Sequence, residues 1–322
     1  MVRNVGILLI LSLLVGCSSM RSAGLGVVSP MFKEAMTGIE SEGRWEHFKK
    51  ATPANLTLVD GLLSVRPHDP SLLLAAIKGN AGYAFGVEET LYLEDKLNDE
   101  EESVHKDNAI AYYSKAVEYG LRFLNDNDLS LSDLQKAQKE AKGVRGLLAS
   151  QLSNDETTLE LMLFFAQSMG SLINMQRDNI LLVAQLPIVK GMFDWVCDET
   201  PDIAHGTCSI FYGSYEAGRP ATLGGNPTEG KRIFEELISK NPANWLARVS
   251  LMQYYSIPQY DEDSYYFHKK SMEKYVDILK ESFYWSPGKE GDEHLKDPTL
   301  RLYQAIAIKR YEIIKKYEKD LF

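Results

Sequence analysis

Hydrophobic residues recur at the three- and four-residue spacing of amphipathic helices along most of this chain. The clearest example is the stretch 205–242, which predicts a helix, a long turn over 219–226 and a second helix. Asn226 is placed to cap the second helix with Pro227 at its first position, and an Asn-Pro pair ends it. The stretch therefore predicts an antiparallel helix pair, which is the unit of helical repeat proteins.

The same reading of the whole chain predicts an all-α fold of about a dozen helices without a strand. The acidic run 94–107 is expected to be a solvated loop, because the ligand spacing and the glycine of a calcium-binding EF-hand are missing. Residues 31–322 are expected to form one helical-repeat domain. Outside 205–242, the expected helices are 31–50, 52–65, 71–93, 108–124, 132–152, a helix capped by Asn154 that runs to Met175, 178–196, 245–257, 261–284 and 297 onward.

A spacing of apolar residues before proline occurs three times. An apolar residue stands eight positions before the proline and another stands five before it, and the sets are Val59, Leu62 and Pro67; Phe193, Val196 and Pro201; Phe234, Leu237 and Pro242. This pattern is similar to the second helix of a tetratricopeptide repeat, so it predicts degenerate tetratricopeptide-like hairpins. The alternative is that three unrelated helices end at proline, which is common.

The first 16 residues are typical of a lipoprotein signal peptide. Arg3 precedes an apolar run over 5–15 that is too short to span a membrane. The run ends in Leu-Val-Gly-Cys17, which is similar to a bacterial lipobox, whose cysteine thiol accepts diacylglycerol. We expect residues 17–30 to form a lipid-anchored tether on the periplasmic side of a bacterial membrane. Ser18 favours the outer membrane, and an ordinary secretory signal with an incidental cysteine is the alternative.

The cysteine count gives a second expectation. Of three cysteines, lipidation of Cys17 leaves Cys197 and Cys208 as an even pair in an oxidising compartment. They flank the turn between two expected helices, so we expect a disulfide between them, with two buried free thiols as the alternative. Neither cysteine has further ligands at a spacing that would indicate a metal site.

Composition and charge narrow the classes of function. The chain has 322 residues, of which 44% are hydrophobic and 25% are charged, and its formal net charge is −10. Because no basic run interrupts this negative balance, nucleic-acid partners are excluded. Residues 225–232 match the phosphate-loop pattern except at Arg232, where a Ser or Thr hydroxyl must meet Mg²⁺. We therefore expect neither an enzyme nor a bound cofactor or metal.

Several pieces of the chain together carry a resemblance to a known family, and they are Thr52–Leu56, Gly82–Phe85, Ile173-Asn174 with Arg177-Asp178, Tyr212–Gly225 and Glu229–Lys231. The most specific piece is Arg219-Pro220 followed by Leu-Gly-Gly. Over residues 45 to about 322 the chain resembles the T component of tetratricopeptide-protein-associated TRAP transporters. The acidic run 94–107 and the pair Cys197 and Cys208 depart from the family pattern.

The resemblance implies an accessory lipoprotein of a TRAP-type solute uptake system. Such a protein docks a periplasmic substrate-binding protein, is compatible with a homo-oligomer such as a trimer, and holds or passes a small organic ligand. The alternative is a structural scaffold lipoprotein of the cell envelope.

The polar residues nearest to the resembling pieces are Asn174, Arg177, Tyr212 and Arg219. They are expected to edge one cleft for a ligand or partner, in which an arginine meets a carboxylate. The alternative is structural, with Arg219 bonding helix-end carbonyls and Asn174 capping its own helix.

Overall fold

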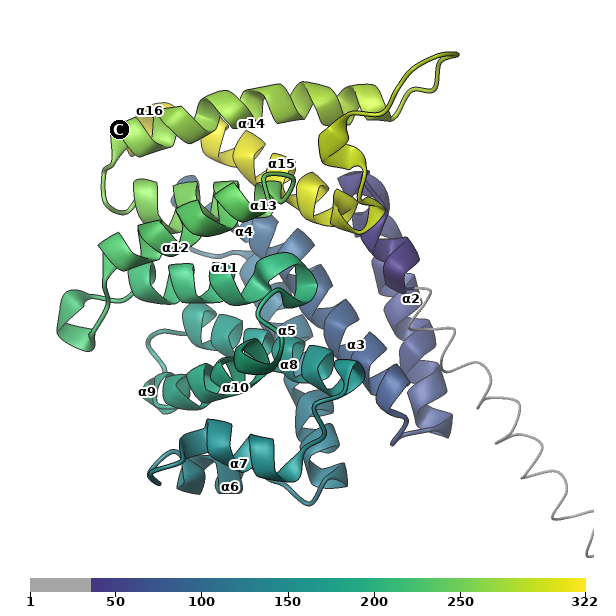
Figure 1. Cartoon of the computed structure of the whole chain (residues 1–322), viewed down its shortest axis with the longest axis vertical. Helices are drawn as coiled ribbons and strands as arrows, with labels where there is room; N and C mark the ends of the chain where they lie inside the picture. Colours follow the sequence, from purple (N-terminus) through teal and green to yellow (C-terminus); the bar gives the residue numbers. More distant parts are fainter. Residues whose placement is uncertain (1–35) are drawn as a thin grey trace, which may run out of the picture.

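The computed structural model describes residues 36–322, and within this range the chain forms helices and turns without a strand (Figure 1). The all-α class expected from the sequence is thereby confirmed. The α-helices described in full are α2 (Trp45–Val65), α3 (Pro70–Tyr83), α4 (Glu89–Leu97), α5 (Val104–Asp126), α6 (Leu131–Ala137), α7 (Gly143–Gln151), α8 (Glu156–Met175), α9 (Ile180–Val183), α10 (Leu186–Glu199), α11 (Ile203–Gly218), α12 (Pro227–Lys240), α13 (Trp245–Leu251), α14 (Glu262–Ser282), α15 (Arg301–Lys316) and α16 (Glu318–Leu321).

Two five-residue π-helices interrupt this α-helical order. The π-helix η1 (Ala84–Glu88) joins α3 to α4, and η3 (Met252–Ser256) continues α13. A π-turn holds one more residue than an α-turn, so the side chains beyond it are rotated about the helix axis. Short 3₁₀ turns follow at η2 (Ala221–Leu223), η4 (Glu293–Leu295) and η5 (Pro298–Leu300).

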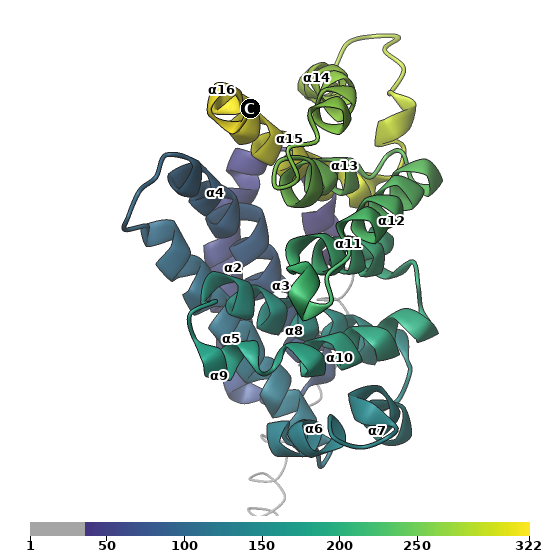
Figure 2. The same ribbon diagram turned by 90° about the vertical axis from the view of Figure 1, so that its left-hand side faces the viewer.

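The helices stack along the long axis of the molecule. In Figure 1, α14 crosses the top, α13, α12 and α11 lie below it, and α6 and α7 close the bottom. Figure 2 shows α2 to α5 on one side and α10 to α14 on the other. The helix α15 returns to contact both α2 and α4, so the two ends of the described chain meet.

Two large hydrophobic clusters hold the helices together. The first core fills the space among α3, α5, α8 and α10, and it includes Leu73, Ile77, Phe165, Phe193 and Trp195. The helix α8 is buried on most of its circumference, as its nearly all-round apolar pattern predicted. The second core lies among α13, α14 and α15, and it includes Trp245, Tyr265, Met272, Tyr311 and Ile314.

Several helix boundaries differ from the sequence expectation by one or two residues. Ser130, rather than Ser132, forms the capping box before α6, with Asp133 as its partner. Asp155, rather than Asn154, caps α8 by accepting a 3.1 Å hydrogen bond from the amide of Thr158. In both places the chain offers two neighbouring capping residues, so the sequence pattern alone does not distinguish them.

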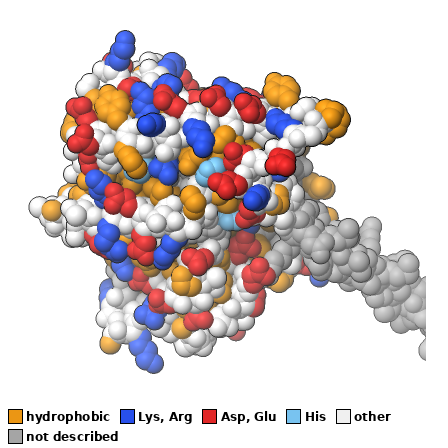
Figure 3. All heavy atoms as spheres, turned by 45° about the horizontal axis from the view of Figure 1, so that its top comes forward, with side chains coloured by type: hydrophobic (Ala, Val, Ile, Leu, Met, Phe, Trp, Pro, Cys, Tyr) orange, Lys and Arg blue, Asp and Glu red, His pale blue; other side chains and the backbone are white. Residues whose placement is uncertain are grey.

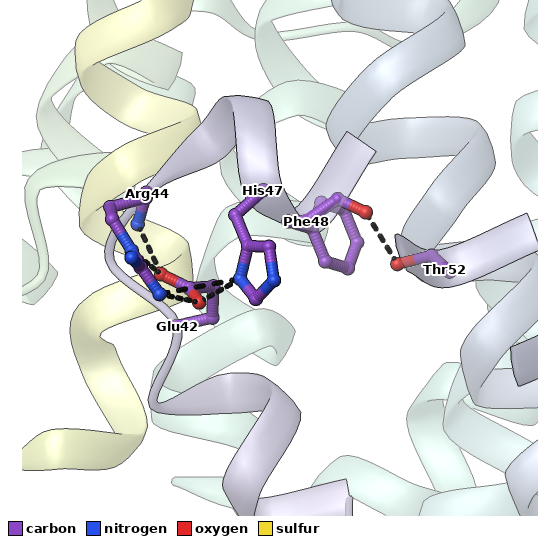
Figure 4. Close-up of polar contacts among 5 residues, drawn as sticks. All are labelled: Glu42, Arg44, His47, Phe48 and Thr52. Carbon is purple, nitrogen blue, oxygen red and sulfur yellow. Dashed lines mark hydrogen bonds and ion pairs between the residues drawn. The ribbon is translucent and has the colours of Figure 1, made fainter. Parts of the chain in front are cut away.

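Pro53 does not open a helix as expected but lies inside α2. Proline has no amide hydrogen, which normally breaks a helix by removing one bond of the ladder. Just before it, the hydroxyl of Thr52 donates a 2.8 Å hydrogen bond to the carbonyl of Phe48, which supplies a side-chain bond in this turn (Figure 4). The expected 31–50 helix ends instead at a break over residues 41–44.

The acidic run is shorter as a loop than the sequence suggested. The helix α4 continues to Leu97, and Ser103 caps α5 by accepting from the amide of Lys106 at 3.1 Å. Only residues 98–103 are therefore non-helical. The sequence expectation was too long because clustered carboxylates are compatible with an exposed helix as well as with a loop.

One described stretch, Ile180–Glu199, is long and apolar enough to cross a membrane by length and composition alone. In the structure it is split into α9 and α10 near Pro187, as the proline predicted. Ile188, Met192 and Trp195 are buried in the first core, so the apolar character of α10 reflects packing within the protein.

Candidate functional site

The hairpin of α11 and α12 is built as the sequence predicted. Asn226 caps α12 by accepting a 3.2 Å hydrogen bond from the amide of Glu229, and Pro227 begins the helix. The two helices lie so close that a Cβ atom on Gly230 would be 2.7 Å from the carbonyl oxygen of Gly213. The antiparallel pair is thus confirmed, whereas its assignment to a tetratricopeptide-like repeat stays a prediction.

Arg219 lies at the end of α11 and turns back on its own helix and turn. Its Nε donates to the carbonyl of Tyr215 at 3.0 Å, and its Nη2 donates to Gly224 O and to Glu216 Oε1, both at 3.1 Å. The guanidinium also stacks 3.7 Å from the centre of the Tyr215 ring. These are the contacts that the structural alternative for Arg219 predicts, since they occupy helix-end carbonyls.

Tyr212 lies in the middle of α11 and faces α10. Its hydroxyl donates a 2.7 Å hydrogen bond to Asp194 Oδ1, and Lys190 holds the same carboxylate at 2.8 Å. Burial first, and then the bond to Asp194, raises the pKa of the Tyr212 phenol. Tyr212 is therefore a neutral hydrogen-bonding group that joins α11 to α10.

A groove of about 330 Å³ runs between α11 and α12. Ile233 and Leu237 give it an apolar floor, and most of its charged lining residues are acidic. Of the four residues expected to edge a cleft, Tyr212 is among those that line it. The full lining is Pro201, Asp202, Ser209, Tyr212, Glu216, Glu229, Ile233, Glu236, Leu237 and Lys240.

Asn174 and Arg177 lie together at the end of α8, outside the lining of this groove. Arg177 Nε donates to Asn174 Oδ1 at 3.1 Å, and both side chains are exposed. The structure thus brings Asn174 to Arg177, and it places Tyr212 at the groove and Arg219 on the turn beside it. The function of all four residues in ligand or partner binding stays a prediction.

Cys197 at the end of α10 and Cys208 in α11 are drawn as a disulfide, with Cα atoms 5.9 Å apart. The loop that they close contains three consecutive residues with positive φ, at Ala204 (46°), His205 (59°) and Gly206 (86°). Only glycine adopts this region without strain, so neighbouring contacts must hold the other two in place. Cys17 lies outside the described residues.

His205 anchors this turn to the C-terminal half of the chain. Its carbonyl accepts from Asn244 Nδ2 at 2.8 Å, and its Nε2 lies 3.1 Å from the hydroxyl of Thr299. The Thr299 hydroxyl also donates to Asp297 at 2.6 Å, so the imidazole is the donor toward Thr299. The imidazole ring also meets the edge of Tyr303, with ring centres 5.1 Å apart.

A partly buried ion cluster was not predicted from the sequence. Lys78 on α3 pairs with Glu40 at 2.7 Å and with Glu160 on α8. Burial opposes the charge of the ammonium, but the two carboxylates outweigh it and raise the pKa of Lys78. The only sequence signal is a lysine inside an apolar stretch. Among residues 36–322, no group of three or more metal-ligating side chains is placed to hold an ion.

Comparison with known proteins identifies the family. No curated protein matches the chain. A family model described as "TRAP transporter T-component" matches residues 45–322, which is the described chain from the first residue of α2 onward. That family is an accessory component of a transporter rather than a family of enzymes. With most of its length matched, this all-α chain belongs to the TRAP transporter T-component family and has an accessory role in TRAP transport.

Proposed function

We propose that this chain is a periplasmic lipoprotein that docks the substrate-binding protein of its TRAP transporter through the groove between α11 and α12. The family match supports the association with the transport system. The lipobox at Cys17 supports a lipid anchor, and Ser18 after it favours the outer membrane. The observation that carries the docking surface is the groove itself, which combines an apolar floor with an acidic rim.

The chemistry of the groove favours a protein segment over an organic acid. The cations at the groove are already ion-paired, Lys240 with Glu236 at 2.8 Å and Arg232 with Glu229 at 2.7 Å, so neither offers an open counter-charge to a carboxylate ligand. The carboxylates of these pairs can instead share their charge with lysines or arginines that flank an apolar anchor. Arg219, the arginine expected to meet such a ligand, already contacts Glu216 and two backbone carbonyls. If a small organic molecule enters the groove, an apolar or cationic one fits it better than an anion.

The test is direct binding to the cognate substrate-binding protein. Ile233→Arg places a large cation on the groove floor, so we expect it to abolish association measured by sedimentation velocity at tens of micromolar. Leu58→Arg is the matched control, because Leu58 is an exposed apolar residue on α2, outside the groove. Normal binding by Ile233→Arg would show that the docking surface is not this groove. Absence of binding by the unmodified chain would favour the scaffold alternative.

The same measurement reports self-association, for which a trimer is the expected state. The lipid anchor has its own test, because mass spectrometry of membrane-extracted protein should show the acyl mass on Cys17. A soluble periplasmic product that Cys17→Ser leaves unchanged would rule out the anchor.

A further inference from the structure

The helix α14 ends in an exposed aromatic tip, which we define as Phe283, Tyr284 and Trp285. Their side chains are 45%, 75% and 85% exposed. In Figure 1 the loop that follows α14 projects from the upper right of the molecule, and in Figure 3 hydrophobic side chains stand out at that edge. Every residue from 280 to 290 is exposed. The three aromatic side chains therefore form an exposed apolar patch and add little to the packing of the protein's own cores.

The position of the tip is fixed by contacts rather than left open. Lys289 donates to the carbonyls of Glu281 and Tyr284, the latter at 3.2 Å, so it closes the end of α14. Gly288 reverses the chain with a φ of 75°. These bonds fix the backbone at Tyr284, and the side chains of Tyr284 and Trp285 stay exposed.

The tip also contacts the start of the described chain. A Cβ atom on Gly43 would lie 3.5 Å from the ring of Phe283, so the turn before α2 packs beside the tip. That turn is braced by Glu42, whose carboxylate accepts from Arg44 Nε and Nη2 at 2.9 Å and meets His47 (Figure 4). The bond with Arg44 is the main reason that the pKa of Glu42 is lowered to about 2.

This placement puts the tip near the membrane if Cys17 carries the lipid. About 19 residues lead from Cys17 to residue 36, so even a fully extended segment reaches at most about 65 Å. The described chain begins only a few residues before Gly43, and Figure 1 shows these first residues on the same side of the molecule as the loop after α14. A lipid anchor would therefore keep residue 36, and with it the adjacent turn and tip, within reach of the bilayer surface, at most about 65 Å away.

The side chains suit the interface between headgroups and acyl chains. Tryptophan and tyrosine prefer this layer, because each combines an apolar ring with a polar group. The flanking charges nearly cancel, with Lys280 and Lys289 beside Glu281 and Glu290, so a zwitterionic bilayer would not repel the tip. We propose, on the basis of the proposed lipid anchor, that the aromatic tip inserts into the headgroup layer of the bilayer that carries the acylated N-terminus and so orients the protein on it.

Tryptophan fluorescence tests this proposal on the full mature chain. Trp45, Trp195 and Trp245 are buried, so Trp285 is the tryptophan that solvent or lipid can reach. The acylated protein is reconstituted into phosphatidylcholine vesicles with and without brominated acyl chains. We expect a blue shift and quenching by the brominated lipid, both lost in Trp285→Phe.

A matched reporter excludes general proximity to lipid. Leu181 on α9 is 80% exposed, similar to Trp285, but it lies on the opposite side of the molecule in Figure 1, where α9 is labelled. In a Trp285→Phe background, Leu181→Trp should remain unquenched. Equal quenching of the two reporters, or no quenching of Trp285 in vesicles that carry the protein, would overturn the proposal.

The proposal of a lipid anchor and the proposal of membrane insertion by the tip can be tested separately. If mass spectrometry finds no acyl chain on Cys17, the same chain is coupled through that thiol to a maleimide lipid, and the quenching is repeated. Quenching would then support the tip although the native anchor had failed. A response of Trp285 to the substrate-binding protein, without any response to vesicles, would instead assign the tip to a protein partner.

Discussion

The two cores of this protein bury polar groups in different ways. Around the first core, the Lys78–Glu160 pair is only partly buried, and the fully buried polar side chains on α3 and α8 satisfy nearby backbone: Ser168 on α8 donates to the carbonyl of Phe164 at 2.8 Å, and Asp69 caps α3. Around the second core, charged side chains are buried and paired, with Arg310 1% and Arg248 9% exposed. The first kind of burial is local in sequence, whereas the second joins segments far apart.

Arg310 on α15 shows what this means for the second core. Its Nε donates to Thr90 at 3.0 Å and its Nη2 to the carbonyl of Phe85 at 2.8 Å, and Nη2 lies 3.5 Å from Glu89. Its Nη1 donates to Gln253 at 3.2 Å. The arginine thus ties α15 to both π-helices, η1 through Phe85 and η3 through Gln253.

The partner of Arg310 is held just as closely. Glu89 accepts from Tyr113 on α5 at 2.6 Å and, more weakly, from Tyr254 in η3 at 3.4 Å. Apolar packing tolerates many side chains of similar volume, but a buried ion network requires each partner in one position. The comparison therefore teaches that the arrangement of the second core against α4 and α5 depends on a few directional contacts.

The largest expected effect comes from breaking this network. Arg310→Met leaves the Glu89 carboxylate buried without its counter-charge, so we expect the free energy of unfolding to fall by about 3–5 kcal/mol. Urea unfolding followed by circular dichroism measures it. Because a buried pair is often replaceable by apolar residues, Arg310→Met with Glu89→Leu should recover most of the loss. A single variant as stable as the unmodified chain would show that the network is not needed.

The predicted disulfide between Cys197 and Cys208 gives the matching test in the first core. Replacing Cys197 and Cys208 by alanine should lower the free energy of unfolding by about 3 kcal/mol, because the link constrains the unfolded chain. Each single variant should lose nearly the same amount, since one cysteine cannot form the bond. Non-reducing peptide mapping provides the direct check, and quantitative alkylation of both thiols in periplasmic protein would contradict the pairing.

The sequence predicted what depends on local pattern and missed what depends on distant partners. The cap at Asn226 and the split at Pro187 follow from residue types within a few positions. Nothing near Arg310 in the sequence indicates that its partners come from residues 85–90 and 253, more than 50 positions away. The same applies to the candidate site, where Tyr212 could be placed on α11 but its bond to Asp194 could not.

A pH change tests the second core without altering the ion pair. His268 Nδ1 lies 2.8 Å from Arg248 Nη1, and burial together with that guanidinium lowers the pKa of His268 to about 4. The unfolded chain then binds more protons than the folded one between pH 6.5 and 4, so stability falls as the pH falls through this window. Relative to His268→Gln, the unmodified chain should lose about 2 kcal/mol on going from pH 7 to pH 5. Parallel stability curves for the two proteins would contradict the shift.

The smallest expected effect concerns Arg219, for which a structural function and a function in binding predict different results. Arg219 is partly exposed, and its contacts lie within one helix end and the turn that follows, so it resembles the local burial of the first core more than the network of Arg310. If it is structural, Arg219→Ala should lower the free energy of unfolding by about 1 kcal/mol, or the melting temperature by about 2 °C. Arg219→Lys should show much of the same loss, because an ammonium cannot reproduce the fork of bonds to Tyr215, Glu216 and Gly224.

If Arg219 is functional instead, the alanine variant should melt normally but fail to bind the substrate-binding protein or support uptake. Unchanged melting together with full uptake would dispose of both readings, and Glu216 would then be the next residue to test at the groove.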